Sequence, residues 1–332
     1  MAEYINIRGQ SIEVVASDPA NPTLGQIWYN STSNTLKGLG VSSVGSWATG
    51  NNLNTAREGL GGAGTQTAAL AFAGYTTPAS PTGSALTEEY DGTSWVNSNL
   101  MNTARYSLAG SKLGTQTAVV GFGGFTTVRT GATEEYDGTS WTTSPGTLNT
   151  ARDGIGGTGI QTAALALAGV VPPYTTATEE YDGSSWTTSG SMNTARGYLG
   201  SAGTQTAGLA VGGYAPPGVQ NATEEYNGAT WTSSNPLIIQ KTGLTCAGTQ
   251  TAGLAAGGGD GPGYTTSTEL YDGTSWTSNP TGMNTGRQNM AGTGSQTFAL
   301  AFGGQGPTPA RQAATEEWTG AGAPLTVTIT AS

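Results

Sequence analysis

Short apolar runs alternate with half-polar segments along most of this chain. Residues 118–124 form one such run, whose length and composition predict a strand that is covered on both faces. After a variable loop, residues 133–136 alternate in the two-residue period of a half-exposed strand. Asp137-Gly138 then predicts a hairpin turn into a strand at 140–143. Since residues 105–111 form a further strand rich in small side chains, the whole stretch predicts four consecutive strands.

This four-strand pattern recurs six times with a period of about 45 residues, which is typical of propeller blades. Each copy opens on Asn-Thr-Ala-Arg, passes through Thr-Gln-Thr-Ala and an apolar run, and closes on Thr-Glu-Glu-Tyr-Asp-Gly-Thr-Ser-Trp, with variants. A single sheet of this size cannot bury its own faces, so we predict an all-β propeller. The basic position falls at Arg57, Arg105, Arg152, Arg196, Lys241 and Arg287, and the aromatic position at Tyr90, Tyr136, Tyr181, Tyr226, Tyr271 and Trp318.

The repeated words are similar to the Kelch repeat. They share a Gly pair after the apolar strand, a Tyr followed by Asp, and a Trp five residues beyond the Tyr. From about residue 47 to its end, the chain therefore resembles Kelch-type β-propellers. The resemblance implies a six-bladed β-propeller with four-stranded antiparallel blades. The copies depart from it at Ala73-Gly74 and Ala168-Gly169, where the Gly pair decays, and at Trp318, which replaces the Tyr.

We expect the propeller to span residues 46–332 and a short β-hairpin extension to span residues 1–45. The sixth copy lacks the Asp-Gly-Thr-Ser-Trp element, whereas an orphan Gly45-Ser46-Trp47 stands ahead of the first copy. Trp47 could therefore supply the outer strand of the last blade. The alternative is the β pattern at residues 325–330, and both segments could pair there, one outside the other.

The segment at residues 18–30 resembles sequences near the start of tailed-phage virion proteins. It predicts a hairpin of residues 26–30 and 35–39, which is either an attachment element or an ordinary hairpin packed on the propeller. The N-terminus shows no basic segment followed by an apolar one, and the longest apolar run, residues 68–73, is too short to span a bilayer. We therefore expect the protein to leave its cell by lysis, as part of a virus particle.

The composition excludes several function classes. The formal net charge is −10, and an acidic chain this poor in Lys and Arg is not expected to bind nucleic acid or anionic membranes. Without any His, a copper site, a Ser-His-Asp hydrolase and a structural zinc site are excluded, so we expect neither cofactor nor metal. The single Cys246 cannot form an internal disulfide and is either a small core residue or a reactive thiol.

Pairs of adjacent Glu residues precede the aromatic position in five copies. Paired carboxylates can hydrolyse glycosides. Adjacent residues of a strand point to opposite faces, however, so the two members of a pair cannot act on one substrate. We expect them to be solvated charges or partners of the repeated Arg: Glu88-Glu89, Glu134-Glu135, Glu179-Glu180, Glu224-Glu225 and Glu316-Glu317.

The repeated basic residues have two interpretations. They directly precede the innermost strands and should surround the propeller axis on one face. In the structural interpretation, each pairs with a Glu or with loop carbonyls and locks adjacent blades. In the functional one, they bind an anion such as an acidic sugar, because Arg grips carboxylates with two hydrogen bonds. The candidate ligand-binding residues of this ring are Arg57, Arg105, Arg152, Arg196, Lys241 and Arg287.

The loops on the same face differ in every copy, whereas the turns on the opposite face are nearly identical. Variable loops on a rigid scaffold often carry recognition, although unconstrained surface loops would vary in the same way. Aromatic rings suit contacts with sugars or proteins. The aromatic candidates in these loops are Tyr75, Phe125, Tyr174, Tyr214 and Tyr264.

Together these features predict a propeller that binds and does not catalyse. We expect it in a tailed-phage particle, where it contacts other virion proteins or a host-surface glycan or receptor, and where it could form homo-oligomers. Two alternatives stay open. One is an extracellular lectin of a cell, and the other is a glycan-cleaving propeller that uses Glu and Asp.

Overall fold

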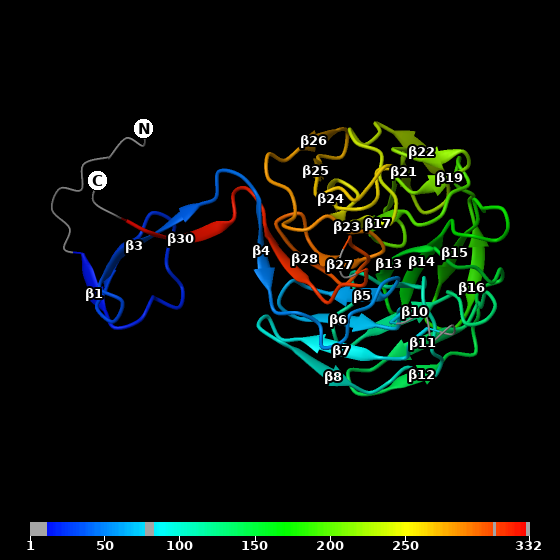
Figure 1. The fold of residues 1–332 in the computed structure, drawn as a ribbon, viewed down its shortest axis with the longest axis horizontal. Coiled ribbons are helices and arrows are strands. Elements are labelled where there is room, and N and C mark those ends of the chain that lie inside the picture. Colours follow the sequence, from blue (N-terminus) through cyan, green and yellow to red (C-terminus); the bar gives the residue numbers. More distant parts are fainter. Residues whose placement is uncertain (1–11, 77–82, 308–309, 330–332) are drawn as a thin grey trace. The chain divides into compact units, whose positions relative to one another are not determined.

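The computed structural model describes residues 12–76, 83–307 and 310–329 (Figure 1). All regular elements of these residues are β-strands. The chain divides into two compact units, one of residues 1–45 with 320–332 and the other of residues 46–319. In the larger unit, small sheets follow one another around a common axis (Figure 1).

The described part of the larger unit contains six four-stranded antiparallel sheets. Five are meanders whose strands follow chain order, and the fourth of these carries a small extra hairpin of β19 (Tyr214–Ala215) and β20 (Gly218–Val219). The five meanders are β5 (Gly61–Gly64), β6 (Ala69–Phe72), β7 (Thr87–Tyr90) and β8 (Trp95–Ser98); β9 (Ala109–Gly110), β10 (Val119–Phe122), β11 (Thr133–Tyr136) and β12 (Trp141–Thr143); β13 (Gly156–Ile160), β14 (Ala163–Leu167), β15 (Thr178–Tyr181) and β16 (Trp186–Ser189); β17 (Gly200–Gly203), β18 (Gly208–Val211), β21 (Thr223–Tyr226) and β22 (Trp231–Ser234); and β23 (Thr245–Thr249), β24 (Ala252–Ala256), β25 (Thr268–Tyr271) and β26 (Trp276–Ser278).

The sixth sheet is completed from the other end of the larger unit. It consists of β27 (Ala291–Gly294), β28 (Phe298–Phe302), β29 (Thr315–Thr319) and, as its outer strand, β4 (Ser46–Gly50). Trp47 lies opposite Trp318 in this pairing, with ring centroids 5.4 Å apart. Trp47 therefore supplies the missing outer strand, and the alternative, a closing strand at residues 325–330, is wrong.

The C-terminal strand belongs to the smaller unit instead. The predicted hairpin is present as β2 (Ile27–Asn30) and β3 (Thr35–Val41), and β30 (Pro324–Thr328) pairs with β3, while the short β1 (Glu13–Val15) runs parallel to β2. The described residues 320–329 thus belong to the smaller unit and not to the propeller in which we expected them, since β30 pairs with β3. Asp18 ties this sheet together by accepting hydrogen bonds from Trp28, Asn30 and Lys37, which lowers its pKa to about 2.

The predicted strands agree with the observed ones in the second copy, except for the first. There only Ala109–Gly110 remain in the ladder as β9. The spacing from Arg105 to Gln116 is two residues longer than the equivalent spacing in the other five copies, and the extra length forms a turn at Lys112 and Leu113. The repeat is therefore broken at one place near the axis.

The same contacts join each sheet to the one before it, including the first sheet to the sixth. The Trp of the outer strand donates its indole N–H to a Thr of the preceding sheet at 2.9–3.0 Å. The Gln of the Thr-Gln-Thr turn donates to two backbone carbonyls of that sheet, as Gln66 does to Ala299 and Trp318. The Trp–Thr pairs are Trp95–Thr315, Trp141–Thr87, Trp186–Thr133, Trp231–Thr178, Trp276–Thr223 and Trp47–Thr268.

A third seam contact explains the Tyr and the second Glu of each closing element. The Tyr hydroxyl donates to the second Glu of the preceding sheet, and burial together with this bond raises the pKa of Tyr136, Tyr181, Tyr226 and Tyr271 to about 12. The Tyr rings are at most 1% exposed, so they fill the space between sheets as predicted. The pairs are Tyr90–Glu317, Tyr136–Glu89, Tyr181–Glu135, Tyr226–Glu180 and Tyr271–Glu225.

The sixth seam replaces this polar pair by an apolar one. Trp318 stands in place of the Tyr, and Leu270 of the preceding sheet stands in place of the second Glu. The two belong to one apolar cluster, and Trp318 is fully buried with its indole N–H bonded to Gln296 O at 2.8 Å. Leu270 and Trp318 thus depart from the repeat together, and each apolar replacement compensates for the other because the two side chains belong to one cluster.

We predict that Leu270→Glu and Trp318→Tyr each destabilise the protein, because each sets a polar group against an apolar partner. Together they recreate the Tyr–Glu pair of the other seams, so the double variant should recover a coupling free energy of about 0.5–3 kcal/mol. Chemical denaturation of the wild type, the two single variants and the double variant measures this coupling. Purely additive losses would contradict the pairing.

Candidate functional site

The six repeated basic residues are buried in the sheets. Each is 0% exposed and pairs with the first Glu of the closing element of its own sheet, at 3.0 Å for Arg57 and 2.9 Å for Lys241. This corrects the ligand-binding interpretation, because these side chains present no charge to an anion. It also refines the structural one, because the pair lies within a sheet and not between neighbouring sheets. The pairs are Arg57–Glu88, Arg105–Glu134, Arg152–Glu179, Arg196–Glu224, Lys241–Glu269 and Arg287–Glu316.

These ion pairs hold the segment that leads into each innermost strand. In the first copy, the second carboxylate oxygen of Glu88 accepts the backbone N–H of Asn54 at 2.6 Å, and Asn54 Nδ2 donates to Trp95 O at 3.0 Å. Arg57 also donates to the carbonyl of Leu86 at 2.8 Å. Burial lowers the pKa of Arg57 to about 10, against the opposing effect of Glu88. The Asn-Thr-Ala-Arg motif therefore fixes where the backbone approaches the axis.

A closed cycle of backbone hydrogen bonds follows directly. The second residue after each basic residue donates its N–H to the carbonyl of its counterpart in the preceding sheet, at 2.7–2.9 Å, and Gly59 completes the cycle by donating to Asn289. All six have a left-handed backbone, with φ of 52–61°. Gly adopts this region freely, whereas a side chain there carries strain. The cycle consists of Gly59, Ser107, Gly154, Tyr198, Gly243 and Asn289.

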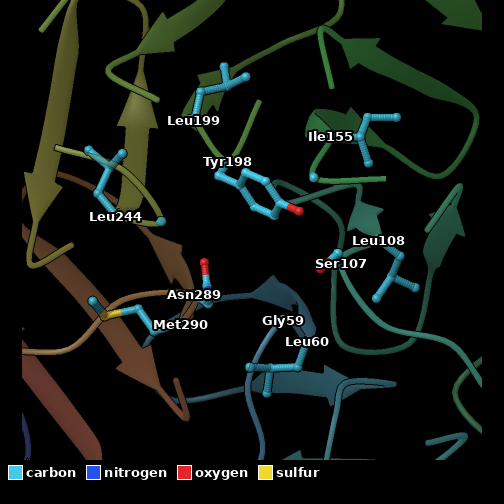
Figure 2. Close-up of a pocket in the computed structure, with 12 residues that line it drawn as sticks. Gly59, Leu60, Ser107, Leu108, Ile155, Tyr198, Leu199, Leu244, Asn289 and Met290 are labelled. Carbon is cyan, nitrogen blue, oxygen red and sulfur yellow. The ribbon is translucent and has the colours of Figure 1, made fainter. Parts of the chain in front are cut away.

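A cavity of about 360 Å³, which we call the axial cavity, opens beside this cycle. A narrower space of about 80 Å³ is lined by the cycle and by the next residue of each copy, which is always apolar. Figure 2 shows the Tyr198 ring pointing into the opening that these apolar side chains surround. The axial cavity is lined by Glu58, Gly59, Tyr75, Tyr106, Ser107, Tyr198 and Asn289, and the apolar residues are Leu60, Leu108, Ile155, Leu199, Leu244 and Met290.

Around the cycle, each copy forms an isolated β-bridge at equivalent positions, and we call the two members of this bridge the bridge residues. One member directly follows the basic residue, and the other follows the Gly pair of the second strand or its variant. The backbone pairing is the same in every copy, but the side chains differ. The bridge pairs are Glu58–Tyr75, Tyr106–Phe125, Asp153–Val170, Gly197–Tyr214, Thr242–Gly259 and Gln288–Gln305.

The aromatic bridge residues of the first two copies form one row, apart from Tyr214 of the fourth copy. Tyr106 lies between Tyr75 and Phe125, with ring centroids 5.1 and 5.5 Å apart. Loop arginines cover both ends of this row, with the guanidinium of Arg311 4.5 Å from the Tyr75 centroid and that of Arg129 5.8 Å from the Phe125 centroid. These distances are within the range of cation–π contacts. The fifth and sixth copies place only Thr, Gly and Gln at the bridge positions.

The same two arginines hold the two acidic bridge residues. Arg311 Nε lies 3.3 Å from Glu58, and Arg129 Nε lies 2.6 Å from Asp153. Burial raises the pKa of both carboxyl groups, and the arginines oppose this shift. Burial likewise raises the pKa of Tyr198 to about 12. The arrangement offers an aromatic row together with hydrogen-bond donors and acceptors, which is the chemistry that recognises polyhydroxylated ligands.

Only some of the predicted aromatic candidates belong to this site. Tyr75 lines the axial cavity, Phe125 and Tyr214 are bridge residues, and Tyr174 packs on Tyr214 with centroids 5.9 Å apart. Tyr264 forms a backbone bridge to Gly259 within its loop and is not among the residues that line the axial cavity. Sequence reasoning missed the rest of the site. Its members stand one or two places after the basic residue, where the copies differ, or in the loops: Glu58, Tyr106, Tyr198, Asn289, Arg129 and Arg311.

Cys246 is fully buried in β23, and burial raises its pKa to about 11, which agrees with a small core residue and not with a reactive thiol. In the described part of the chain, no group of three or more His, Cys, Asp or Glu residues is placed to hold a metal ion. The described residues also include no helix long and apolar enough to span a membrane.

Comparisons with known proteins identify the fold only. No family model matches the chain, and no curated protein matches it. Among solved structures, that of YjhT, a β-propeller-like fold, matches with a TM-score of 0.67 over 83% of this chain and 99% of the YjhT chain. This chain has a β-propeller-like fold. The two sequences are 12% identical, so the similarity concerns architecture and says nothing of activity.

We predict that Glu134→Ala lowers the free energy of unfolding by about 3–5 kcal/mol, because it leaves the fully buried Arg105 without its partner. Replacing both members, as Arg105→Met with Glu134→Leu, should cost much less, since no uncompensated charge remains. Thermal and chemical denaturation measure both changes. Equal losses in the single and double variants would show that the ion pair is not what holds this segment.

Proposed function

We propose that the chain is a six-bladed Kelch-type β-propeller that binds a glycan in the axial cavity and performs no chemistry on it. The blade count is supported by the six four-stranded sheets and by the cycle of backbone bonds that returns to its start. The Kelch assignment is supported by the positions of the Gly pair, the Tyr and the Trp within each copy.

The observation that carries the binding proposal is that the bridge side chains vary from copy to copy while the backbone that holds them stays the same. The bridge residues differ in every copy, although ion pairs, seams and backbone bonds around them repeat. Within the cycle, Tyr198 occupies a left-handed position where Gly would carry no strain, and strain of this kind is concentrated at functional sites. Side chains that vary on an unvarying backbone are typical of a recognition surface.

The size and lining of the axial cavity favour a sugar over a flat protein epitope. Its volume of about 360 Å³ lies within the range of small-ligand sites. Aromatic faces accept the apolar face of a sugar ring, and Glu58 and Asn289 can exchange hydrogen bonds with hydroxyl groups.

A catalytic role has one supporting observation, the raised pKa of Glu58 and Asp153. Raised carboxyl pKa values are typical of general acids. Each of these carboxylates is paired with an arginine, however, which favours its charged form and its use as a fixed acceptor. We therefore prefer binding, and a reducing-sugar assay on any bound glycan separates the two functions.

We predict that the wild type binds defined glycans on an array and that Tyr106→Ala weakens the strongest hit about tenfold or more, since it removes the centre of the aromatic row. Thr242→Ala is the matched control, because Thr242 occupies the same bridge position in a copy whose two bridge residues are not aromatic. Its affinity should equal that of the wild type. Absence of any glycan hit, or equal effects of both substitutions, would contradict the proposal, and release of reducing ends would replace it by catalysis.

We further propose that the protein is part of a tailed-phage particle, with the smaller unit as its attachment element. This rests on the likeness of residues 18–30 to phage virion proteins and on the separate compactness of that unit. The alternative is an extracellular lectin of a cell. Immunogold labelling should decorate intact virions, and unlabelled virions beside labelled cell surfaces would favour the lectin.

A further inference from the structure

The turns at the other end of the innermost strands repeat almost without change, apart from three apolar departures. Leu113 belongs to the two-residue insertion of the second copy, Phe298 replaces the Ala that ends Thr-Gln-Thr-Ala, and Ile160 replaces its first Thr. Phe298 and Ile160 are 40% and 47% exposed. Apolar side chains have thus been placed on a face whose other turns present Thr and Ala.

Two of these departures meet in one pocket. A pocket of about 660 Å³, which we call the turn-face pocket, is lined by turns of the sixth, first and second copies. The axial cavity lies at the opposite ends of the same innermost strands, near residues 57–59. The residues that line the turn-face pocket are Gly64, Thr65, Gln66, Thr67, Leu113, Gly114, Thr115, Gly294, Ser295 and Phe298.

The insertion builds the inner wall of this pocket by crossing the axis. Leu113 N donates to Gly159 O at 3.0 Å, and the carbonyl of Lys112 accepts from Thr293 Oγ1 at 2.9 Å. The Lys112 amine points away from the pocket and donates to Ser201 O at 3.1 Å and Cys246 O at 3.4 Å. The insertion thereby bonds to the third, fourth, fifth and sixth sheets, and its position is fixed.

The lining selects against charge. The described residues that line the pocket carry no ionisable group. Several of its polar groups already have partners. Thr65 accepts from Ala68 N and Ser295 accepts from Phe298 N within their own turns, and Gln66 donates to two backbone carbonyls of the preceding sheet. The apolar part of the lining consists of the Phe298 ring, the Leu113 side chain and the methyl groups of threonines.

We infer that the turn-face pocket is a second binding site, which takes one small, uncharged and largely apolar molecule stacked on Phe298. Its volume lies in the range of small-molecule sites, which are mostly apolar with few polar groups. The inference is independent of the glycan proposal, because the two sites share no lining residue.

Two variants that restore the repeat test this site. Phe298→Ala brings back the Ala of the other copies, and deletion of residues 112–113 brings back their spacing, so both resemble copies that fold. The probe is Nile red, an uncharged dye whose fluorescence rises in apolar surroundings. We expect one equivalent to bind the wild type and each variant to weaken it about tenfold, as loss of a buried aromatic or aliphatic contact implies.

Ile160→Ala is the matched control, since Ile160 is exposed on the same face but does not line the pocket. It should leave dye affinity unchanged, as should Tyr106→Ala in the axial cavity. Unchanged binding by Phe298→Ala would overturn the inference. Self-association of the wild type in sedimentation that Phe298→Ala abolishes would also overturn it, because a second copy would then occupy the pocket.

Discussion

The structure depends on one constraint: a sheet of four short strands cannot bury both of its faces, so every seam between neighbours must be closed. The chain solves this with the same contacts at each seam, an indole bonded to a Thr hydroxyl and a Gln bonded to two carbonyls, and with a Tyr–Glu pair at five of the six. These bonds satisfy polar groups that the packing of sheets would otherwise bury unpaired. Because the sixth copy lacks its own outer strand, Trp47 from the N-terminal side supplies that strand and the indole that bonds to Thr268 of the fifth sheet.

Most of the recurring sequence serves this closure, and residues that depart from the repeat line the two proposed sites. The buried Arg–Glu pair fixes the approach to the axis, and the backbone cycle fixes the next two positions. With the backbone held by these bonds, side chains one place after the basic residue can change without disturbing the fold. Glu58, Tyr106 and Asp153 occupy that place in successive copies. Because the backbone is held in place, aromatic side chains can cluster at two neighbouring copies although the six copies share nearly the same backbone.

Sequence periodicity predicted the strands well, since β11 begins and ends where the alternation of residues 133–136 does. It predicted that Trp47 supplies the closing strand, because Gly45-Ser46-Trp47 stands ahead of the first copy and the sixth copy lacks its own Asp-Gly-Thr-Ser-Trp element. It could not locate the site. The repeat shows that a basic residue is required at position 57 but does not show what it contacts. A buried ion pair with Glu88 and an exposed anion site would both produce the same repeated Arg. Pairings such as Leu270 with Trp318, or Arg129 with Asp153, join segments whose proximity exists only after folding.

The two ends of the axis differ for a physical reason. At the loop end, the backbone cycle leaves side chains free to vary, and variation there costs only the strain of positions such as Tyr198. At the turn end, each Gln must reach two carbonyls of the preceding sheet, so the turns vary little, and a new surface comes from a substitution such as Phe298 or from an insertion. Lys112 and Leu113 are such an insertion, and the desolvated Lys112 amine, with its lowered pKa, is bonded only to backbone carbonyls among the described residues. A desolvated amine without a carboxylate partner offsets part of what the hydrogen bonds of this insertion contribute to stability, and the same insertion places Leu113 in the wall of the turn-face pocket.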